Sequence, residues 1–110
     1  MEKLKQFLRE QNKKTFLDIG TGTGGFIDFI KSIYNEFESF EGIDVVKQAV
    51  DFANKNSDDE RIQFKVMDAY EMEYSDNSFD VVCLSNSLHH LKDISKMLQE
   101  MKRVVKEDGF

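Results

Sequence analysis

The sequence predicts an α/β fold in which helices cover both faces of a parallel sheet. Two observations predict it. Short apolar runs alternate along the chain with longer segments of helical periodicity, and the first run leads directly into the glycine turn GTGTGG at residues 20–25. Strand–helix alternation at this spacing produces right-handed βαβ units and parallel strands. The chain of 110 residues is long enough for one such domain, which we expect to span residues 1–110.

Four short apolar runs predict strands, at residues 15–19, 39–43, 61–66 and 79–84. The first run, TFLDI, precedes the glycine turn and is expected near the centre of the sheet. Polar and apolar residues alternate strictly in the third run, RIQFKV, as in an edge strand. The fourth, FDVVCL, is apolar on both faces, as in a buried strand. The strand order 3-2-1-4 satisfies these requirements.

Four segments with apolar residues at helical spacing predict helices, at residues 2–11, 24–37, 46–56 and 93–107. The last has the clearest pattern. Asp93 can cap its start, and Lys102, Arg103 and Lys106 suit the negative C-terminal end of a helix. Gly109 can end it.

Composition and charge exclude several classes of protein. The formal net charge of −6 argues against a broad basic face for nucleic acid. No apolar run approaches the roughly 18 residues of a membrane span. The N-terminus fits neither a signal nor a transit peptide, so we expect a cytoplasmic protein. Cys83 is the single cysteine, so no internal disulfide can form, and its apolar run VVCL indicates a buried side chain.

The glycine turn fits two ligand-binding patterns. Residues 20–25 satisfy G-x-G-x-x-G, which dinucleotide sites use, but Asp18 extends the pattern to D-x-G-x-G-x-G. A carboxylate at the strand end would repel a pyrophosphate and attract a cofactor that carries an ammonium and a sulfonium. Asp44 follows Gly20 by 24 residues, at the end of the next apolar run, where a carboxylate can hold the two hydroxyls of a ribose.

Five motifs in order resemble those of class I S-adenosylmethionine-dependent methyltransferases, in the small-molecule branch, from about residue 13 to the C-terminus. They are FLDIGTGTGG at 16–25, GID at 42–44, MDA at 67–69, FDVVCLSNSLHHL at 79–91 and RVVKEDGF at 103–110. The resemblance implies a Rossmann-like three-layer sandwich, S-adenosyl-L-methionine as cofactor, S-adenosyl-L-homocysteine as product, and methyl transfer to a small-molecule acceptor.

The resemblance also implies roles at the cofactor for nine residues. Asp18 would lie near the methionine ammonium, and Asp44 would accept hydrogen bonds from the ribose hydroxyls. Asp68 would accept a hydrogen bond from the adenine amine. The other contributions would come from the backbone of Gly20, Gly22 and Gly24, the side chain of Val45, the N–H of Ala69, and Ser85, through its backbone at the methyl end of the pocket.

Structural alternatives remain for these residues. The glycines could form only a tight turn, Asp44 could cap the helix that begins near Val46, and Asp68 could belong to a solvated acidic loop. His89 and His90 are candidates for a general base, because imidazole titrates near neutrality, yet this pair is commonly structural in similar sequences. The SNSL run does not match the Asn/Asp-Pro-Pro-aromatic motif of amino-methylating relatives, which argues against a nucleobase or glutamine acceptor.

The strand order leaves the fourth strand with a free apolar edge, which is a template for pairing. The run KEDGF at 106–110 resembles the turn into a fifth strand. We therefore expect that the fifth to seventh strands of the family are missing from a truncated domain, or that a homodimer or another partner covers this edge. Two functional alternatives stay open: a cofactor-binding module without turnover, and an NAD(P)-dependent oxidoreductase. No metal-ligand spacing is present in the sequence.

Overall fold

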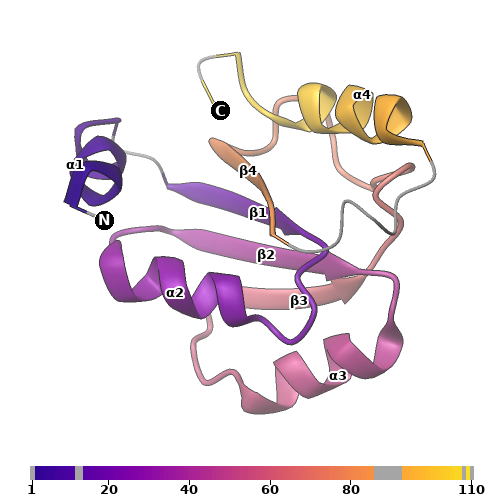
Figure 1. Ribbon diagram of the computed structural model, residues 1–110, viewed down its shortest axis with the longest axis horizontal. Helices are drawn as coiled ribbons and strands as arrows, with labels where there is room; N and C mark the ends of the chain where they lie inside the picture. Colours follow the sequence, from indigo (N-terminus) through magenta and orange to yellow (C-terminus); the bar gives the residue numbers. More distant parts are fainter. Residues whose placement is uncertain (1, 12–13, 86–92, 108, 110) are drawn as a thin grey trace.

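The structure is a computed structural model, which describes residues 2–11, 14–85, 93–107 and 109. Four parallel strands form one sheet in the order β3-β2-β1-β4, which confirms the predicted order (Figure 1). The strands are β1 (Thr15–Ile19), β2 (Ser39–Asp44), β3 (Ile62–Val66) and β4 (Val81–Leu84). The helices are α1 (Glu2–Gln11), α2 (Gly25–Ile33), α3 (Lys47–Asn56) and α4 (Ile94–Val104).

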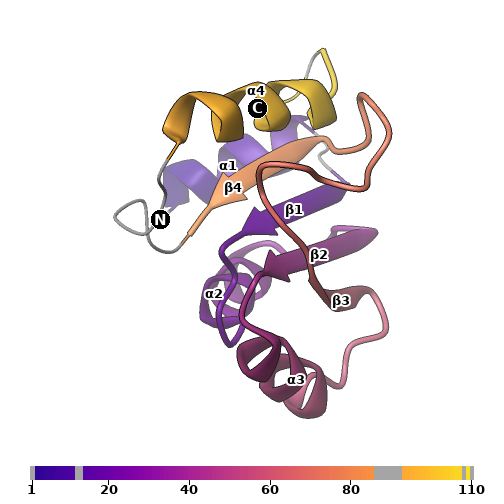
Figure 2. The same cartoon turned by 90° about the vertical axis from the view of Figure 1, so that its right-hand side faces the viewer.

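Helices lie on both faces of the sheet, as predicted. Figure 2 shows α2 and α3 on one face and α4 on the other. Side chains of α2 and α3 pack with Phe16 and Phe40 in one apolar cluster. On the opposite face, Val104 of α4 packs with Leu17 and Ile43 in a second cluster. The sheet therefore separates two apolar cores, as in a three-layer sandwich.

The core on the α2–α3 face is rich in aromatic rings. Phe16 is 1% exposed and stacks on Phe40 with the ring centroids 5.0 Å apart. Tyr34 and Phe37 contact the same ring at centroid distances of 6.0 and 6.3 Å. These rings come from β1, from β2 and from the segment that follows α2, so they fix the position of the sheet's first two strands.

The second predicted helix is four residues too long at its C-terminal end. The pattern predicts a helix over 24–37, but α2 ends at Ile33, and Tyr34 has the extended angles φ −146° and ψ 97°. Tyr34 and Phe37 are both 2% exposed, yet they pack onto the core from the connection to β2. The two rings are spaced in the sequence as they would be on one face of a helix, but they are buried from an extended segment.

The last helix begins as predicted and ends earlier. The Asp93 side chain caps α4 by accepting a hydrogen bond from the Lys96 N–H at 3.0 Å. The helix ends at Val104, and Val105 pairs with Phe79 in an isolated parallel bridge. The helix therefore stops well before Gly109, because its last carbonyls accept hydrogen bonds from the chain that leads into β4.

Strand register brings the carboxyl ends of the strands to one side of the sheet. Ile19 of β1 lies beside Ile43 of β2 and Leu84 of β4. In the described part of the chain, β3 and β4 form the two edges, as the strand order requires. Among the described residues, no helix is long and apolar enough to cross a membrane.

Candidate functional site

The glycine turn lies at the carboxyl end of β1 and is held against β2. The N–H groups of Gly20 and Thr21 both donate to the carbonyl of Ile43, at 2.9 and 3.0 Å. Gly20, Gly22 and Gly24 have positive φ angles of 71°, 56° and 92°. Residues with side chains rarely adopt these angles. The glycines therefore permit a turn that exposes bare backbone at the carboxyl end of β1.

Two glycines also make room for close packing. A Cβ atom on Gly24, the residue that precedes α2, would lie 2.8 Å from the Phe64 ring. A Cβ on Gly42 of β2 would lie 2.6 Å from the Thr21 hydroxyl oxygen. The role of Gly42 was not predicted beyond its place in the GID motif, because the contact joins residues that are distant in the sequence.

The Asp44 carboxylate joins the end of β2 to the glycine turn. Its Oδ2 accepts a hydrogen bond from the Gly22 N–H at 2.9 Å, and its Oδ1 accepts one from the Val46 N–H at 3.0 Å. The second bond closes a turn between Asp44 and the residue two positions on. It is not the predicted helix cap, because the N-cap residue of α3 is Val46 and that cap has no side-chain hydrogen bond. Each carboxylate oxygen retains a further lone pair for a ligand hydroxyl.

Asp18 is a fully buried carboxylate beneath the same turn. Its Oδ2 accepts a hydrogen bond from the Ser85 hydroxyl at 2.8 Å, and that hydroxyl is also 3.4 Å from the Gly20 carbonyl. Among the described residues, Asp18 Oδ1 and the Thr21 hydroxyl oxygen have no hydrogen-bond partner. The prediction gave Ser85 a backbone role only, and its side-chain contact with Asp18 could not be read from residues 67 positions apart.

Burial raises the pKa of Asp18 from 3.8 to about 6. The nearby hydroxyls of Ser85 and Thr21 lower this pKa, and the negative charge of Asp44 raises it further. The neighbouring Cys83, which the sequence predicts to be buried, is only partly buried. Desolvation of its thiol, together with the charge of Asp18, raises the pKa of that thiol to about 12. The thiol is therefore protonated at neutral pH and is not a nucleophile. A positive group beside Asp18 would instead offset the cost of its buried charge.

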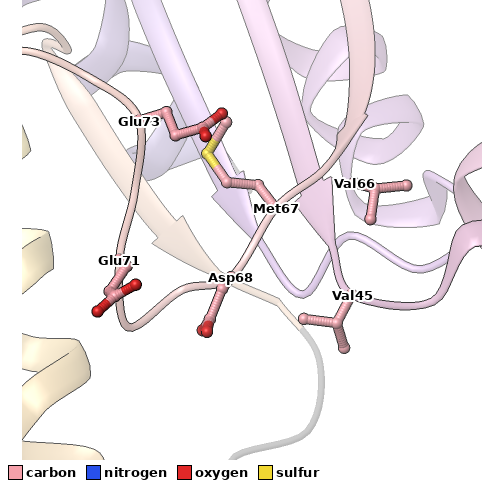
Figure 3. A pocket seen from close by; sticks show the side chains of 6 residues that line it. All are labelled: Val45, Val66, Met67, Asp68, Glu71 and Glu73. Atoms are coloured by element: carbon pink, nitrogen blue, oxygen red, sulfur yellow. The ribbon is translucent and has the colours of Figure 1, made fainter.

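A pocket of about 440 Å³ opens beyond the ends of β2 and β3 (Figure 3). Its lining combines exposed apolar side chains with carboxylates: Val45, Val66, Met67, Asp68, Glu71 and Glu73. The Asp68 Oδ1 accepts a hydrogen bond from the Tyr70 N–H at 2.8 Å, and its carbonyl accepts one from the Glu71 N–H at 3.1 Å. Asp68 therefore stabilises a turn at the pocket wall and presents its carboxylate beside Val45.

The predicted cofactor residues lie along one side of the sheet. Asp18, the three glycines and Ser85 lie at the ends of β1 and β4. Asp44 ends β2 and is followed by Val45, and Asp68 and Ala69 follow β3. His89 and His90 lie outside the described residues. Within residues 2–11, 14–85, 93–107 and 109, no group of three His, Cys, Asp or Glu side chains could hold a metal ion.

Comparison with known proteins identifies the family. A family model described as a methyltransferase domain matches residues 17–110. The 27-O-demethylrifamycin SV methyltransferase of Amycolatopsis mediterranei is 35% identical over 97 residues, which are 84% of this chain and 35% of that protein. Curated relatives of this chain are longer: the chain spans 24–47% of the length of eight of them.

Solved structures share the fold. The YcgJ protein of Bacillus subtilis superposes with a TM-score of 0.80 at 25% identity, over 98% of this chain and 47% of that one. Phosphoethanolamine N-methyltransferase 2 of Haemonchus contortus, solved with S-adenosyl-L-methionine, has a TM-score of 0.79 at 30% identity, over 88% and 23%. With the family match over residues 17–110, these likenesses establish that the chain belongs to the class I S-adenosylmethionine-dependent methyltransferases.

Proposed function

We propose that this domain holds S-adenosyl-L-methionine across the carboxyl ends of β1, β2 and β3, and that the protein transfers its methyl group to a small-molecule acceptor. The observation that carries this proposal is the buried Asp18 carboxylate, whose Oδ1 has no partner among the described residues. A buried carboxylate with a free oxygen favours a cationic ligand, and the methionine end of this cofactor carries an ammonium.

The other residues of the site fit the same ligand. The turn from Gly20 to Gly24 offers backbone without side chains, on which the methionine and ribose parts can rest. The Asp44 carboxylate is held in place by two N–H groups and keeps lone pairs for the ribose hydroxyls. Val45, which is 66% exposed, and Asp68 line a pocket suited to a flat base.

In the proposed mechanism the bound cofactor supplies an electrophilic methyl group on its sulfonium. The residues described here would contribute alignment: Asp18 would lie near the ammonium, Asp44 would orient the ribose and Asp68 would accept from the adenine amine. Such positioning lowers the barrier to an in-line displacement by fixing the reacting atoms. A general base is needed only where the acceptor must lose a proton, and His89 and His90 remain the predicted candidates for that role.

The relatives support a small-molecule acceptor. The rifamycin and phosphoethanolamine methyltransferases are named for such substrates, and they match this chain across most of its length. The negative net charge of −6 also argues against a nucleic-acid acceptor held by its phosphates.

Titration calorimetry with S-adenosyl-L-homocysteine and with NAD tests the cofactor assignment. We expect saturable binding of the first and none of the second, because Asp18 disfavours a pyrophosphate. The matched control is Asp44→Ala, which removes the ribose acceptor on the adjacent strand. Tight binding of NAD, with no binding of S-adenosyl-L-homocysteine, would instead support a nicotinamide-dependent oxidoreductase.

A binding module without turnover is the second candidate function. It is motivated by the position of β4, which lies at an edge of the sheet formed by the described residues. A methyl-transfer assay that compares this chain with a C-terminally extended version separates the two. Turnover by both versions would refute the binding-module proposal, and turnover by the extended version alone would support it.

A further inference from the structure

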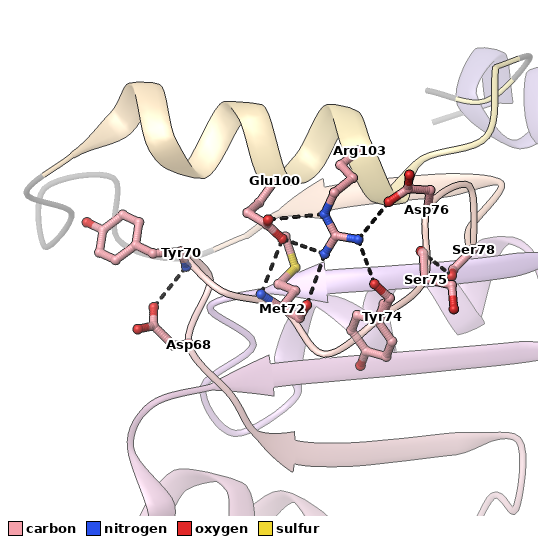
Figure 4. A network of polar contacts seen from close by, with 9 residues as sticks. All are labelled: Asp68, Tyr70, Met72, Tyr74, Ser75, Asp76, Ser78, Glu100 and Arg103. Atoms are coloured by element: carbon pink, nitrogen blue, oxygen red, sulfur yellow. Dashed lines mark hydrogen bonds and ion pairs between the residues drawn. The ribbon is translucent and has the colours of Figure 1, made fainter.

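The segment that carries Asp68 has no helix or strand of its own and is held by α4. This connecting segment, residues 67–79, runs from β3 to β4 along the helix (Figure 4). At the start of α4, the Asp93 N–H donates to the Tyr70 hydroxyl at 3.1 Å. At the helix end, the carbonyls of Arg103 and Val104 accept hydrogen bonds from the N–H groups of residues 77, 78 and 79.

Arg103 provides the central attachment. Its Nη1 donates to the Tyr74 carbonyl at 2.7 Å, and its Nη2 donates to the Met72 carbonyl at 2.9 Å. The guanidinium also contacts Glu100 through Nε and Nη2, at 3.1 and 2.7 Å, and Asp76 through Nη1 at 2.9 Å. These five contacts match the five N–H donors of a guanidinium, so the side chain is fully used by this network.

Glu100 completes the attachment from the same helix. Its Oε2 accepts a hydrogen bond from the Met72 N–H at 3.2 Å while it pairs with Arg103. The peptide groups on both sides of Met72 are therefore held by one ion pair, and the Met72 side chain is 5% exposed in the core beneath. Hydrogen bonds from Arg103 lower the pKa of Glu100, so the pair stays ionised at neutral pH.

We propose that Arg103 is a positioning residue for the cofactor: by holding Met72, it fixes the turn at residues 68–71 in which Asp68 and Ala69 would meet the adenine. The inference rests on the proposed function of Asp68. The described hydrogen bonds of Asp68 are local, to Tyr70 and Glu71. The β3 side of the turn is held by the Met67 N–H, which donates to the Asp44 carbonyl at 3.1 Å, and by packing of Ala69 on the core. Its other side is held through Tyr70 and Met72, where α4 makes the contacts. Because the turn is already ordered in the free protein, ligand binding does not carry the entropy cost of ordering it.

A double-mutant cycle on binding of S-adenosyl-L-homocysteine tests the proposal. Arg103→Met should weaken binding by about tenfold, the value of one hydrogen bond to a charged group. In an Asp68→Ala background the same substitution should change the dissociation constant by less than about twofold, because the contact that Arg103 positions is already gone. Lys102→Met, an exposed neighbour on α4, is the control and should bind as the unchanged protein does.

The outcomes separate this role from general destabilisation and from the proposed function itself. Equal weakening by Arg103→Met in both backgrounds, or no weakening in either, would overturn the positioning role. Failure of the unchanged protein to bind would overturn the proposed function and this role together. If Arg103→Met does not fold, Arg103→Lys replaces it in the cycle, since a lysine keeps the charge but cannot hold both carbonyls in the same geometry.

Amide hydrogen exchange supplies a readout in the absence of any ligand. In Arg103→Lys, we expect faster exchange at Met72 and Tyr70, with unchanged exchange in β1 and β2. Uniform acceleration across the sheet would show a structural role only and would contradict the proposal.

Discussion

Asp18→Asn is expected to stabilise the ligand-free protein at neutral pH. Burial raises the pKa of Asp18 from 3.8 to about 6, so the folded state holds its proton more tightly than the unfolded chain does. Stability from this group is therefore greatest below pH 4 and is lost as the pH rises to about 6. The difference between 3.8 and about 6 corresponds to about 3 kcal/mol, because one pKa unit is worth about 1.4 kcal/mol.

An asparagine removes this cost, since it carries no charge at any pH. Its carbonyl oxygen can accept the Ser85 hydroxyl as Oδ2 does, and its amide can donate toward the Thr21 hydroxyl oxygen, which has no partner in the described part of the chain. At pH 7 we expect the free energy of unfolding to rise by up to about 3 kcal/mol. At pH 4 most of the gain should be gone, because this pH lies well below the folded-state pKa of about 6 and close to the unfolded-state value of 3.8.

Urea unfolding of both proteins at pH 4, 5, 6 and 7 measures this difference. A gain that grows with pH and levels off above about pH 6 is the expected result. A difference that does not depend on pH, or an Asp18→Asn protein that is less stable at pH 7, would refute the reasoning. The same substitution should weaken binding of S-adenosyl-L-homocysteine, because the ammonium loses its counter-charge; unchanged affinity would remove Asp18 from the proposed site.

Three further results are expected. Asp44→Ala should weaken binding of S-adenosyl-L-homocysteine by roughly a hundredfold in calorimetry, because two hydrogen bonds to a charged group are lost, and a change below threefold would argue against ribose contact. Gly24→Ala should cost about 1–3 kcal/mol in urea unfolding, since φ is 92° and the added Cβ meets Phe64, and Phe64→Leu should recover part of that loss. Cys83 should react with a thiol reagent at pH 8 only after unfolding, because its pKa is raised to about 12, and rapid labelling of the folded protein would contradict that.

Much of the fold could be predicted because each strand has its own residue pattern. The strict alternation of RIQFKV places β3 at an edge, and the apolar TFLDI run before the glycine turn places β1 at the centre. The end of α2 could not be predicted in this way. Tyr34 and Phe37 continue the helical spacing in the sequence, but they reach the core from an extended segment, and only tertiary packing distinguishes the two.

Some features of the candidate site could also be predicted from the sequence, and others depend on the fold. Asp44 and the glycines could be placed from local motifs, because strand ends and glycine turns have short-range signatures. The hydrogen bond between Ser85 and Asp18 could not be predicted, since it joins two strands through the fold. Arg103 fits the C-terminal end of a helix, but its contacts with two carbonyls of the connecting segment depend on where that segment runs.

The central claim is that S-adenosyl-L-methionine binds across the carboxyl ends of β1, β2 and β3. Mapping amide chemical shifts during titration with S-adenosyl-L-homocysteine tests it most directly. We expect the shifted signals to be those of residues 20–24, 44–46, 68–70 and 85, with the amides of Glu38, Glu60 and Gln63 at the opposite end of β2 and β3 unchanged. Shifts centred on that opposite end, or no shifts at saturating ligand, would contradict the claim.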